Sequence, residues 1–137
     1  MQTEHKLAAF VVNTAYARLA PEAIAAARDS LLDALDVAFA GRAEPTTKIV
    51  TGFVRRLGGK PEAGAFGTGL RVPSPNSALA NGTVAHVLDY DDTLAGGHGH
   101  PGGVFVPTTM ALGMARQARA ELRHHDQALQ RWKRRQE

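Results

Sequence analysis

The segment SPNSALANGTVAHVLDYDDTLAGGHGHPGGVFVPTTMALGMA (residues 74–115) places a dense polar loop between two apolar stretches. Helical spacing before the loop predicts a helix over about 76–88, with Ser74 and Asn76 as candidate caps. Apolar character returns at Val104, and a further helix is predicted to start near Pro107. The segment therefore predicts two helices joined by a loop that carries most of the reactive side chains.

Three more helices are predicted on the N-terminal side of this segment. Their apolar residues recur at helical spacing over residues 5–18, 21–40 and 45–57. Residues 58–75 are rich in Gly and Pro and allow at most a short extended pairing near 64–72. Aromatic residues make up only 6% of the chain while alanine is abundant, which favours helices over a β-sandwich. The expected class is all-α, a partial helical domain of four or five helices followed by a basic tail or helix.

Composition excludes several classes of protein. A chain of 137 residues fits one domain. Without cysteine it cannot form a disulfide scaffold, a thiolate zinc site, an iron–sulfur cluster or a cysteine nucleophile. No stretch approaches the roughly 20 apolar residues of a membrane span, and the N-terminus lacks a convincing signal-peptide pattern. We therefore expect no membrane partner and a cytoplasmic location.

The excess of positive charge is confined to residues 116–137. Residues 1–115 hold nine Lys or Arg and ten Asp or Glu, whereas residues 116–137 hold seven and three. The second segment is also poor in aliphatic residues, so we expect a mobile or loosely attached helix. A small basic protein that binds nucleic acid or another partner is an alternative reading, but a charge run is more often a solvated face, and nucleic-acid binding is not favoured.

The polar loop is the one dense cluster of reactive groups in the sequence. His86 stands one helical turn before it, and the loop itself contains Asp89, Asp91, Asp92, Thr93, His98 and His100. Such carboxylates and imidazoles can perform general acid–base catalysis or bind a metal ion. A metal-binding module would use Asp89, Asp91, His98 and His100. A third reading is a solvated loop in which the Asp residues form turns and caps.

Four segments carry a resemblance to a known family. They are LAPE (19–22), LLDALDVAFAG (31–41), GTGLRVPSPNSALANGTVAHVLDYDDT (67–93) and HPGGVFVPTTMALGMA (100–115). In this order they resemble the N-terminal part of the MmgE/PrpD family, over about residues 6–115. That family includes 2-methylcitrate dehydratase, cis-aconitate decarboxylase and iminodisuccinate epimerase.

The resemblance implies a function and a set of site residues. The family has a mostly helical domain, completed by later helices and an α/β lid domain. It acts on small di- or tricarboxylates without a cofactor or metal, by removing a proton next to a carboxylate. By position, Asp89 and His100 match active-site residues: His100 would transfer a proton, and Asp89 would orient it or share its proton. Thr93 would bind substrate, and Asp91, Asp92 and His98 would shape the loop.

The resemblance also implies partners and a metabolic role. A member like 2-methylcitrate dehydratase would act in propionate metabolism, and a homodimer is a further expectation. The match ends abruptly near Ala115, where the basic segment begins, so residues 116–137 are interpreted as the product of a frameshift or truncation. Because the family's later Lys, Tyr and His groups are missing here, the chain is expected to be inactive alone.

Overall fold

The computed structural model describes residues 3–94, 96 and 99–133, and only the backbone of residues 118–133. Within these residues it contains five α-helices and one two-stranded sheet, so the predicted all-α class is confirmed. The elements are α1 (Thr3–Asn13), a 3₁₀ turn (Tyr16–Arg18), α2 (Pro21–Gly41), α3 (Pro45–Leu57), β1 (Ala63–Gly64), β2 (Arg71–Val72), α4 (Ser74–His86) and α5 (Pro101–Lys133). The bounds of α3 are those that the periodicity predicts.

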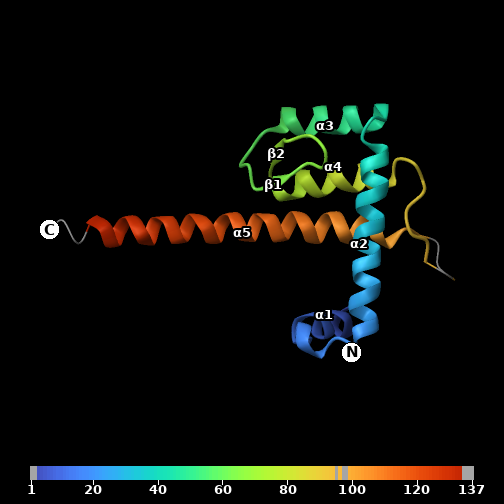
Figure 1. The fold of residues 1–137 in the computed structure, drawn as a ribbon, viewed down its shortest axis with the longest axis horizontal. Coiled ribbons are helices and arrows are strands. Elements are labelled where there is room, and N and C mark those ends of the chain that lie inside the picture. Colours follow the sequence, from blue (N-terminus) through green and yellow to red (C-terminus); the bar gives the residue numbers. More distant parts are fainter. Residues whose placement is uncertain (1–2, 95, 97–98, 134–137) are drawn as a thin grey trace.

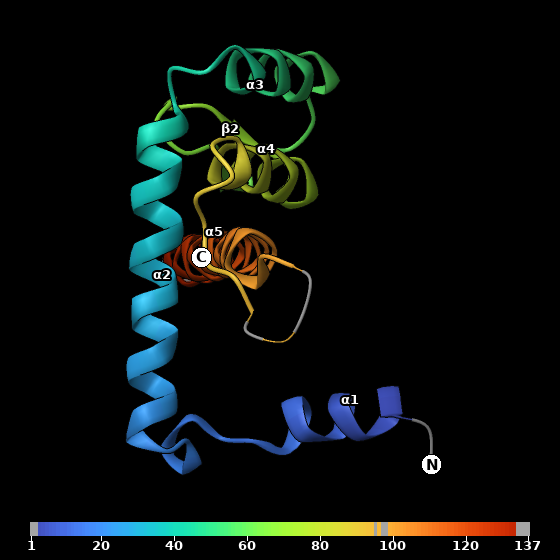
Figure 2. The same cartoon turned by 90° about the vertical axis from the view of Figure 1, so that its right-hand side faces the viewer.

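The helices α3, α4 and α5 are stacked in that order, and α2 runs across the stack (Figures 1 and 2). The two strands form an antiparallel pair beside α3 and α4, with Ala63 opposite Val72. α1 lies at the far end of α2, away from the stack, and α5 continues well beyond it. α4 therefore occupies the middle of the molecule, with neighbours on several sides.

Within the described residues, two small core clusters both include residues of α4. Val54 of α3 packs with Ala65, Val72 and Ala80 of the hairpin region and α4. In the second cluster, Ala38 of α2 packs with Val84 and Ala85 of α4. Most of these side chains are small, so the helices can approach closely and each contact depends on good fit.

Glycines set two of these close approaches. A Cβ on Gly41 would lie 2.5 Å from Val87 Cγ1 and 2.8 Å from the Val84 carbonyl oxygen, so α2 crosses α4 almost backbone to backbone. A Cβ on Gly82 would lie 3.1 Å from the carbonyl oxygen of Gly103, where α4 meets α5. Larger residues at these two positions would push apart the elements that frame the polar loop.

Buried polar side chains of α4 hold the hairpin. Asn81 is fully buried; its amide nitrogen donates to the Gly64 carbonyl at 3.0 Å, and its Oδ1 accepts the Phe66 N–H at 2.7 Å. The Ser77 hydroxyl donates to the same Gly64 carbonyl at 2.7 Å. These bonds satisfy backbone groups that the two-residue strands leave unpaired, and so they fix the hairpin on α4.

Two of the predicted helices have wrong bounds. The first helix ends at Asn13 instead of residue 18, because Asn13 and Thr14 bond back to the carbonyls of Ala9 and Phe10 and a 3₁₀ turn follows. The fourth helix spans Ser74–His86 instead of 76–88. Its N-cap is Pro73, whose side chain makes no capping bond, and the Ser74 N–H donates to Glu62 Oε2 at 3.3 Å, so Ser74 and Asn76 lie within the helix.

The predicted start of the last helix near Pro107 is also wrong. α5 begins at Pro101 and includes Pro107. The Gly102 N–H donates to Asp92 Oδ1 at 2.7 Å, so a carboxylate from the loop stabilises a helix start that Gly102 and Gly103 would otherwise disfavour. The helix then continues without a break past residue 115 to Lys133. None of the helices in the described part of the chain has the length and apolar character needed to cross a membrane.

Candidate active site

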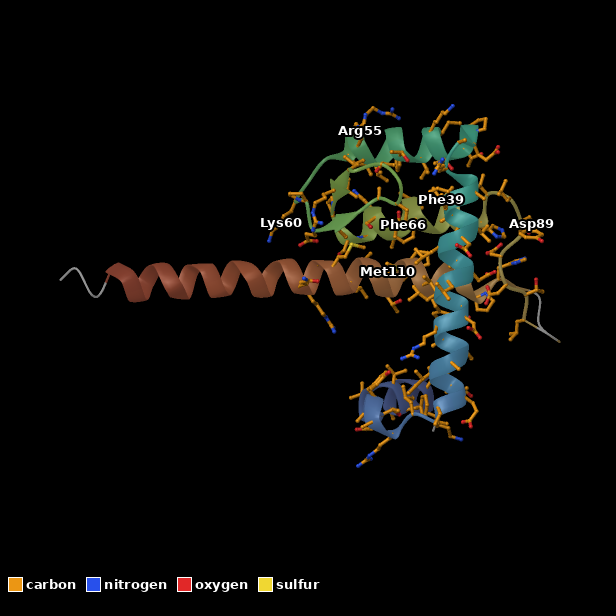
Figure 3. The ribbon with its side chains drawn as sticks, viewed as in Figure 1. Phe39, Arg55, Lys60, Phe66, Asp89 and Met110 are labelled. Carbon is orange, nitrogen blue, oxygen red and sulfur yellow. The ribbon has the colours of Figure 1, made fainter. Side chains whose placement is uncertain are left out.

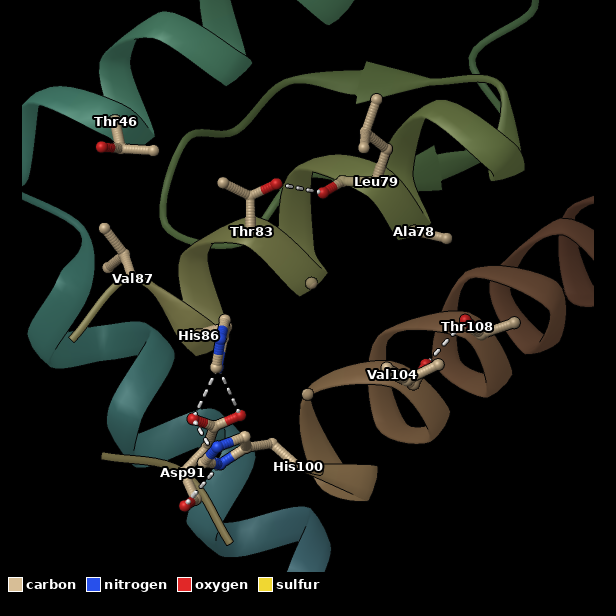
Figure 4. A pocket seen from close by; sticks show the side chains of 12 residues that line it. Thr46, Ala78, Leu79, Thr83, His86, Val87, Asp91, His100, Val104 and Thr108 are labelled. Carbon is tan, nitrogen blue, oxygen red and sulfur yellow. Dashed lines mark hydrogen bonds and ion pairs between the residues drawn. The ribbon is translucent and has the colours of Figure 1, made fainter. Parts of the chain in front are cut away.

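The carboxylate of Asp91 lies at the centre of the polar loop and is fully buried. His86 Nδ1, at the end of α4, lies 2.9 Å from Asp91 Oδ1 and 3.2 Å from Oδ2 (Figure 4). His100 Nδ1, just before α5, lies 3.4 Å from the same Oδ1 and 3.4 Å from the Asp91 backbone oxygen. One buried carboxylate therefore bridges two imidazoles, whose ring centres are 4.8 Å apart.

These contacts fix the tautomers of the two histidines when they are neutral. A carboxylate and a carbonyl oxygen can only accept hydrogen bonds, so the Nδ1 atoms of His86 and His100 carry the protons. Each Nε2 then has a free lone pair. Asp91 thus orients both rings and leaves the outer nitrogen of each ring able to accept a proton.

Asp89 approaches His100 from the solvent side. Its backbone has φ 51°, a left-handed conformation that Asp tolerates better than most residues, and its N–H donates to the His86 carbonyl at 2.9 Å. Its side chain is 79% exposed, and its Oδ1 lies 3.6 Å from His100 Nε2. This is an ion-pair distance without a hydrogen bond. The motif spacing predicts this approach, and His100 lies between two carboxylates.

The next residue along the loop, Asp92, ties the site to α2 and α5. Its N–H donates to Asp33 Oδ2 of α2 at 3.1 Å, while its Oδ1 accepts the Gly102 N–H. A Cβ on Gly102 would lie 2.6 Å from Asp92 Oδ1, and one on Gly103 would lie 2.6 Å from Asp91 Oδ2. Both carboxylates therefore pack against the first turn of α5 at places where only glycine fits without a shift.

A pocket of about 720 Å³ opens beside the two histidines, between α4 and α5. Its walls are mostly apolar or carry a hydroxyl group, and it is lined by Thr46, Ala78, Leu79, Gly82, Thr83, His86, Val87, Asp91, His100, Gly103, Val104 and Thr108 (Figure 4). None of these lining residues is Lys or Arg. Asp91 and the imidazoles are its ionisable groups, so its electrostatic character is anionic or neutral.

The other site residues predicted from the sequence differ in whether they contact the two histidines or line the pocket. Thr93 is exposed and does not line the pocket, so its substrate-binding role stays a prediction. Asp92 shapes the loop by capping α5, and Asp91 contacts both imidazoles in addition. His98 lies outside the described residues. In the view of Figure 3, Asp89 lies on one side of α2, and Lys60 and the hairpin lie on the other.

His86 is the site residue that sequence reasoning did not assign. Its signal was its position three residues before Asp89, which puts it on the last turn of α4 facing the loop. Asp33 had no such signal, since it acts from a helix 59 positions away in the sequence. The structure thus adds one imidazole and one supporting carboxylate to the predicted set.

The fold and the site define a helical domain in which Asp and His side chains gather at the junction of two helices. The family model described as the MmgE/PrpD N-terminal domain matches residues 5–130, and the chain belongs to this family. The match extends beyond residue 115 into the basic segment. The domain boundary expected there stays a prediction. No curated protein matches the chain.

Proposed function

We propose that this domain provides the proton-transfer part of a lyase site for small di- or tricarboxylates, as in 2-methylcitrate dehydratase. Membership of the MmgE/PrpD family suggests an enzyme of the lyase type. The observation that carries the proposal is the position of His100, held by Asp91 on one side and approached by Asp89 on the other. This arrangement is suited to chemistry that needs no cofactor.

His100 is the proton-transfer group in this proposal. Its Nδ1–H points to Asp91, and its Nε2 can remove a proton from the carbon next to a substrate carboxylate. The imidazolium that forms is stabilised by the buried carboxylate of Asp91 and by Asp89, 3.6 Å from Nε2. Asp89, which is exposed, can also pass the proton to solvent or to a leaving hydroxyl group.

The charges around the site indicate that further groups must bind the substrate. A di- or tricarboxylate brings two or three negative charges, yet residues 76–115 contain no Lys or Arg. Stabilising a carbanion-like transition state needs preorganised cationic or hydrogen-bonding donors. We therefore expect no measurable turnover of 2-methylcitrate or cis-aconitate by the 137-residue chain alone.

A chimaera tests the proposed chemistry on this chain's own residues. Residues 74–115 replace the matching segment of a longer, active member of the family, and turnover of that member's polycarboxylate is measured. We expect the chimaera to be active and His100→Ala in it to lower turnover by about 10²-fold or more. The matched control is Tyr90→Phe, at an 82% exposed position of the same loop, which should leave turnover unchanged. Near-normal turnover of the His100→Ala chimaera would remove His100 from the mechanism.

We also propose that the chain forms a homodimer, so that its protein partner is a second copy of itself. Large apolar side chains are exposed on every helix, among them Phe10, Phe39, Phe53, Leu79 and Phe105. Exposed apolar surface on this scale is typical of association sites. Light scattering of the purified chain tests this proposal, and a strictly monomeric protein at micromolar concentration would contradict it.

A further inference from the structure

The two histidines and two aspartates of the site form a set of metal ligands. His86, Asp89, Asp91 and His100 each offer one ligand atom, and all four atoms lie within 4.8 Å of one another. The shortest separations, between His86 Nδ1 or His100 Nδ1 and Asp91 Oδ1, are 2.9 and 3.4 Å. A tetrahedral ion with ligand bonds of about 2.0–2.1 Å would require separations of roughly 3.4 Å.

We propose that this cluster binds one divalent transition-metal ion, with Zn²⁺ as the best fit. Imidazole nitrogens and carboxylate oxygens in a tetrahedral set are typical Zn²⁺ ligands, whereas Mg²⁺ and Ca²⁺ prefer oxygen ligands alone. The ion takes the place of the protons that the two imidazoles share with Asp91. This ligand set differs from the one expected from the sequence, because His86 contributes from α4 in place of His98.

Charge and rigidity support the same inference. With neutral imidazoles, the four side chains carry a formal charge of −2, which a divalent ion balances. No Lys or Arg occurs in residues 76–115 to balance it otherwise. The supports are also fixed: His86 ends α4, Asp91 is fully buried against Gly103, and His100 directly precedes α5. The separations of up to 4.8 Å exceed the roughly 4.2 Å that two bonds of about 2.1 Å can span, so the ligand atoms, among them the exposed Asp89, must move closer together when the ion binds.

The metal and the proton-transfer chemistry exclude each other at His100. An imidazole that binds Zn²⁺ through Nδ1 no longer donates that proton to Asp91, and the ion neutralises the carboxylates that would stabilise an imidazolium. Bound Zn²⁺ would therefore inhibit a site that works by general acid–base catalysis. The binding itself does not depend on the proposed function, since it needs only the ligands and the fold.

Calorimetric titration of the untagged, metal-free chain with Zn²⁺ at pH 7.5 tests the inference. Co²⁺ serves as a spectroscopic probe, because a tetrahedral site gives it intense visible absorption. We expect one ion per chain, and affinity lowered by about 100-fold or more in His86→Ala and in Asp91→Asn. His86 is half-exposed, so its substitution should leave the helical circular dichroism unchanged.

Two controls separate this site from the chain's other histidines. His5→Ala, on α1, and the double variant His124→Ala/His125→Ala should bind Zn²⁺ as tightly as the parent chain. The inference would be overturned if the chain did not bind one Zn²⁺ ion. It would also be overturned if His86→Ala and His100→Ala still bound Zn²⁺ while His124→Ala/His125→Ala did not. These titrations do not depend on turnover. Normal turnover of the His100→Ala chimaera would contradict the lyase proposal without affecting the metal site, and a failed Zn²⁺ titration would contradict the metal site without affecting the lyase proposal.

Discussion

The helices α1 and α4 differ in what they bury, although α1 has the more evident apolar stripe. In α1 no residue is buried, and Leu7, Phe10, Val11 and Val12 are 62–82% exposed. In α4 six residues are buried: Ser74, Ser77, Ala80, Asn81, Val84 and Ala85. The difference shows that an apolar stripe predicts a helix but not its burial. In this domain burial follows small side chains and satisfied hydrogen bonds.

The largest effect is expected from breaking the polar contacts of α4. In Asn81→Leu, the partly buried Phe66 N–H loses its acceptor, and the larger apolar side chain must fit against the Gly64 carbonyl. Each unsatisfied buried group costs about 1–3 kcal/mol, so we expect the free energy of unfolding to fall by about 3 kcal/mol. Urea unfolding followed by circular dichroism measures this change.

The control for Asn81→Leu is Thr83→Val, two residues further along α4. Thr83 bonds only to the Leu79 carbonyl of its own helix, so the expected change is within about 0.5 kcal/mol. Equal effects of the two substitutions would show that the buried amide does not hold the hairpin.

The second prediction compares the same substitution in the two regions. Val54→Ala removes two methyl groups from a fully buried side chain that packs against α4, and should lower the free energy of unfolding by about 2 kcal/mol, from lost apolar burial and the cavity left behind. Val12→Ala, at an 82% exposed position on α1, should change it by no more than about 0.5 kcal/mol. A loss at Val12 as large as that at Val54 would mean that a second copy covers α1.

A third prediction concerns the junction of α4 and α5. A Cβ in Gly103→Ala would lie 2.6 Å from Asp91 Oδ2, so the loop must shift, and the expected loss is about 1.5 kcal/mol. Gly113→Ala on the same helix meets no atom within 4 Å and should stabilise the domain by about 0.5–1 kcal/mol through higher helix propensity. Thermal unfolding of the two variants should therefore move in opposite directions.

The smallest effect is expected from the C-terminal segment. Deleting residues 116–137 should change the free energy of unfolding of the remainder by about 0.5 kcal/mol or less. The segment is poor in aliphatic residues, and α5 carries it beyond the stacked helices (Figure 1). Comparison of urea midpoints for the two chain lengths measures this. A loss of several kcal/mol would instead assign the segment to the folded core.

Local chemistry explains which parts of the fold the sequence predicts. α3 lies between Pro45 and Gly58, and both ends are set by residues next to it, so its predicted bounds are correct. α5 starts at Pro101 because Asp92, ten positions earlier, accepts the Gly102 N–H. Helical periodicity does not reveal a bond of that kind, so it predicts a helix start six residues too late.

The same distinction applies to the site. Asp89 and His100 are close in the sequence and joined by glycines, so their approach could be predicted. The bridging role of Asp91 could not, because it depends on how far α4 and α5 lie apart. Asp33 contributes through a single hydrogen bond from α2, which only the packed structure brings near.

That bond between Asp33 and Asp92 has a consequence for the order in which the molecule assembles. It closes a segment of 59 residues, and the entropy of closing such a segment must be offset before the bond forms. The contacts among α3, the hairpin and α4 join residues that are much closer in the sequence, so these elements can form first. Refolding should therefore restore helical signal early and the environment of the two imidazoles late, once α2 has docked.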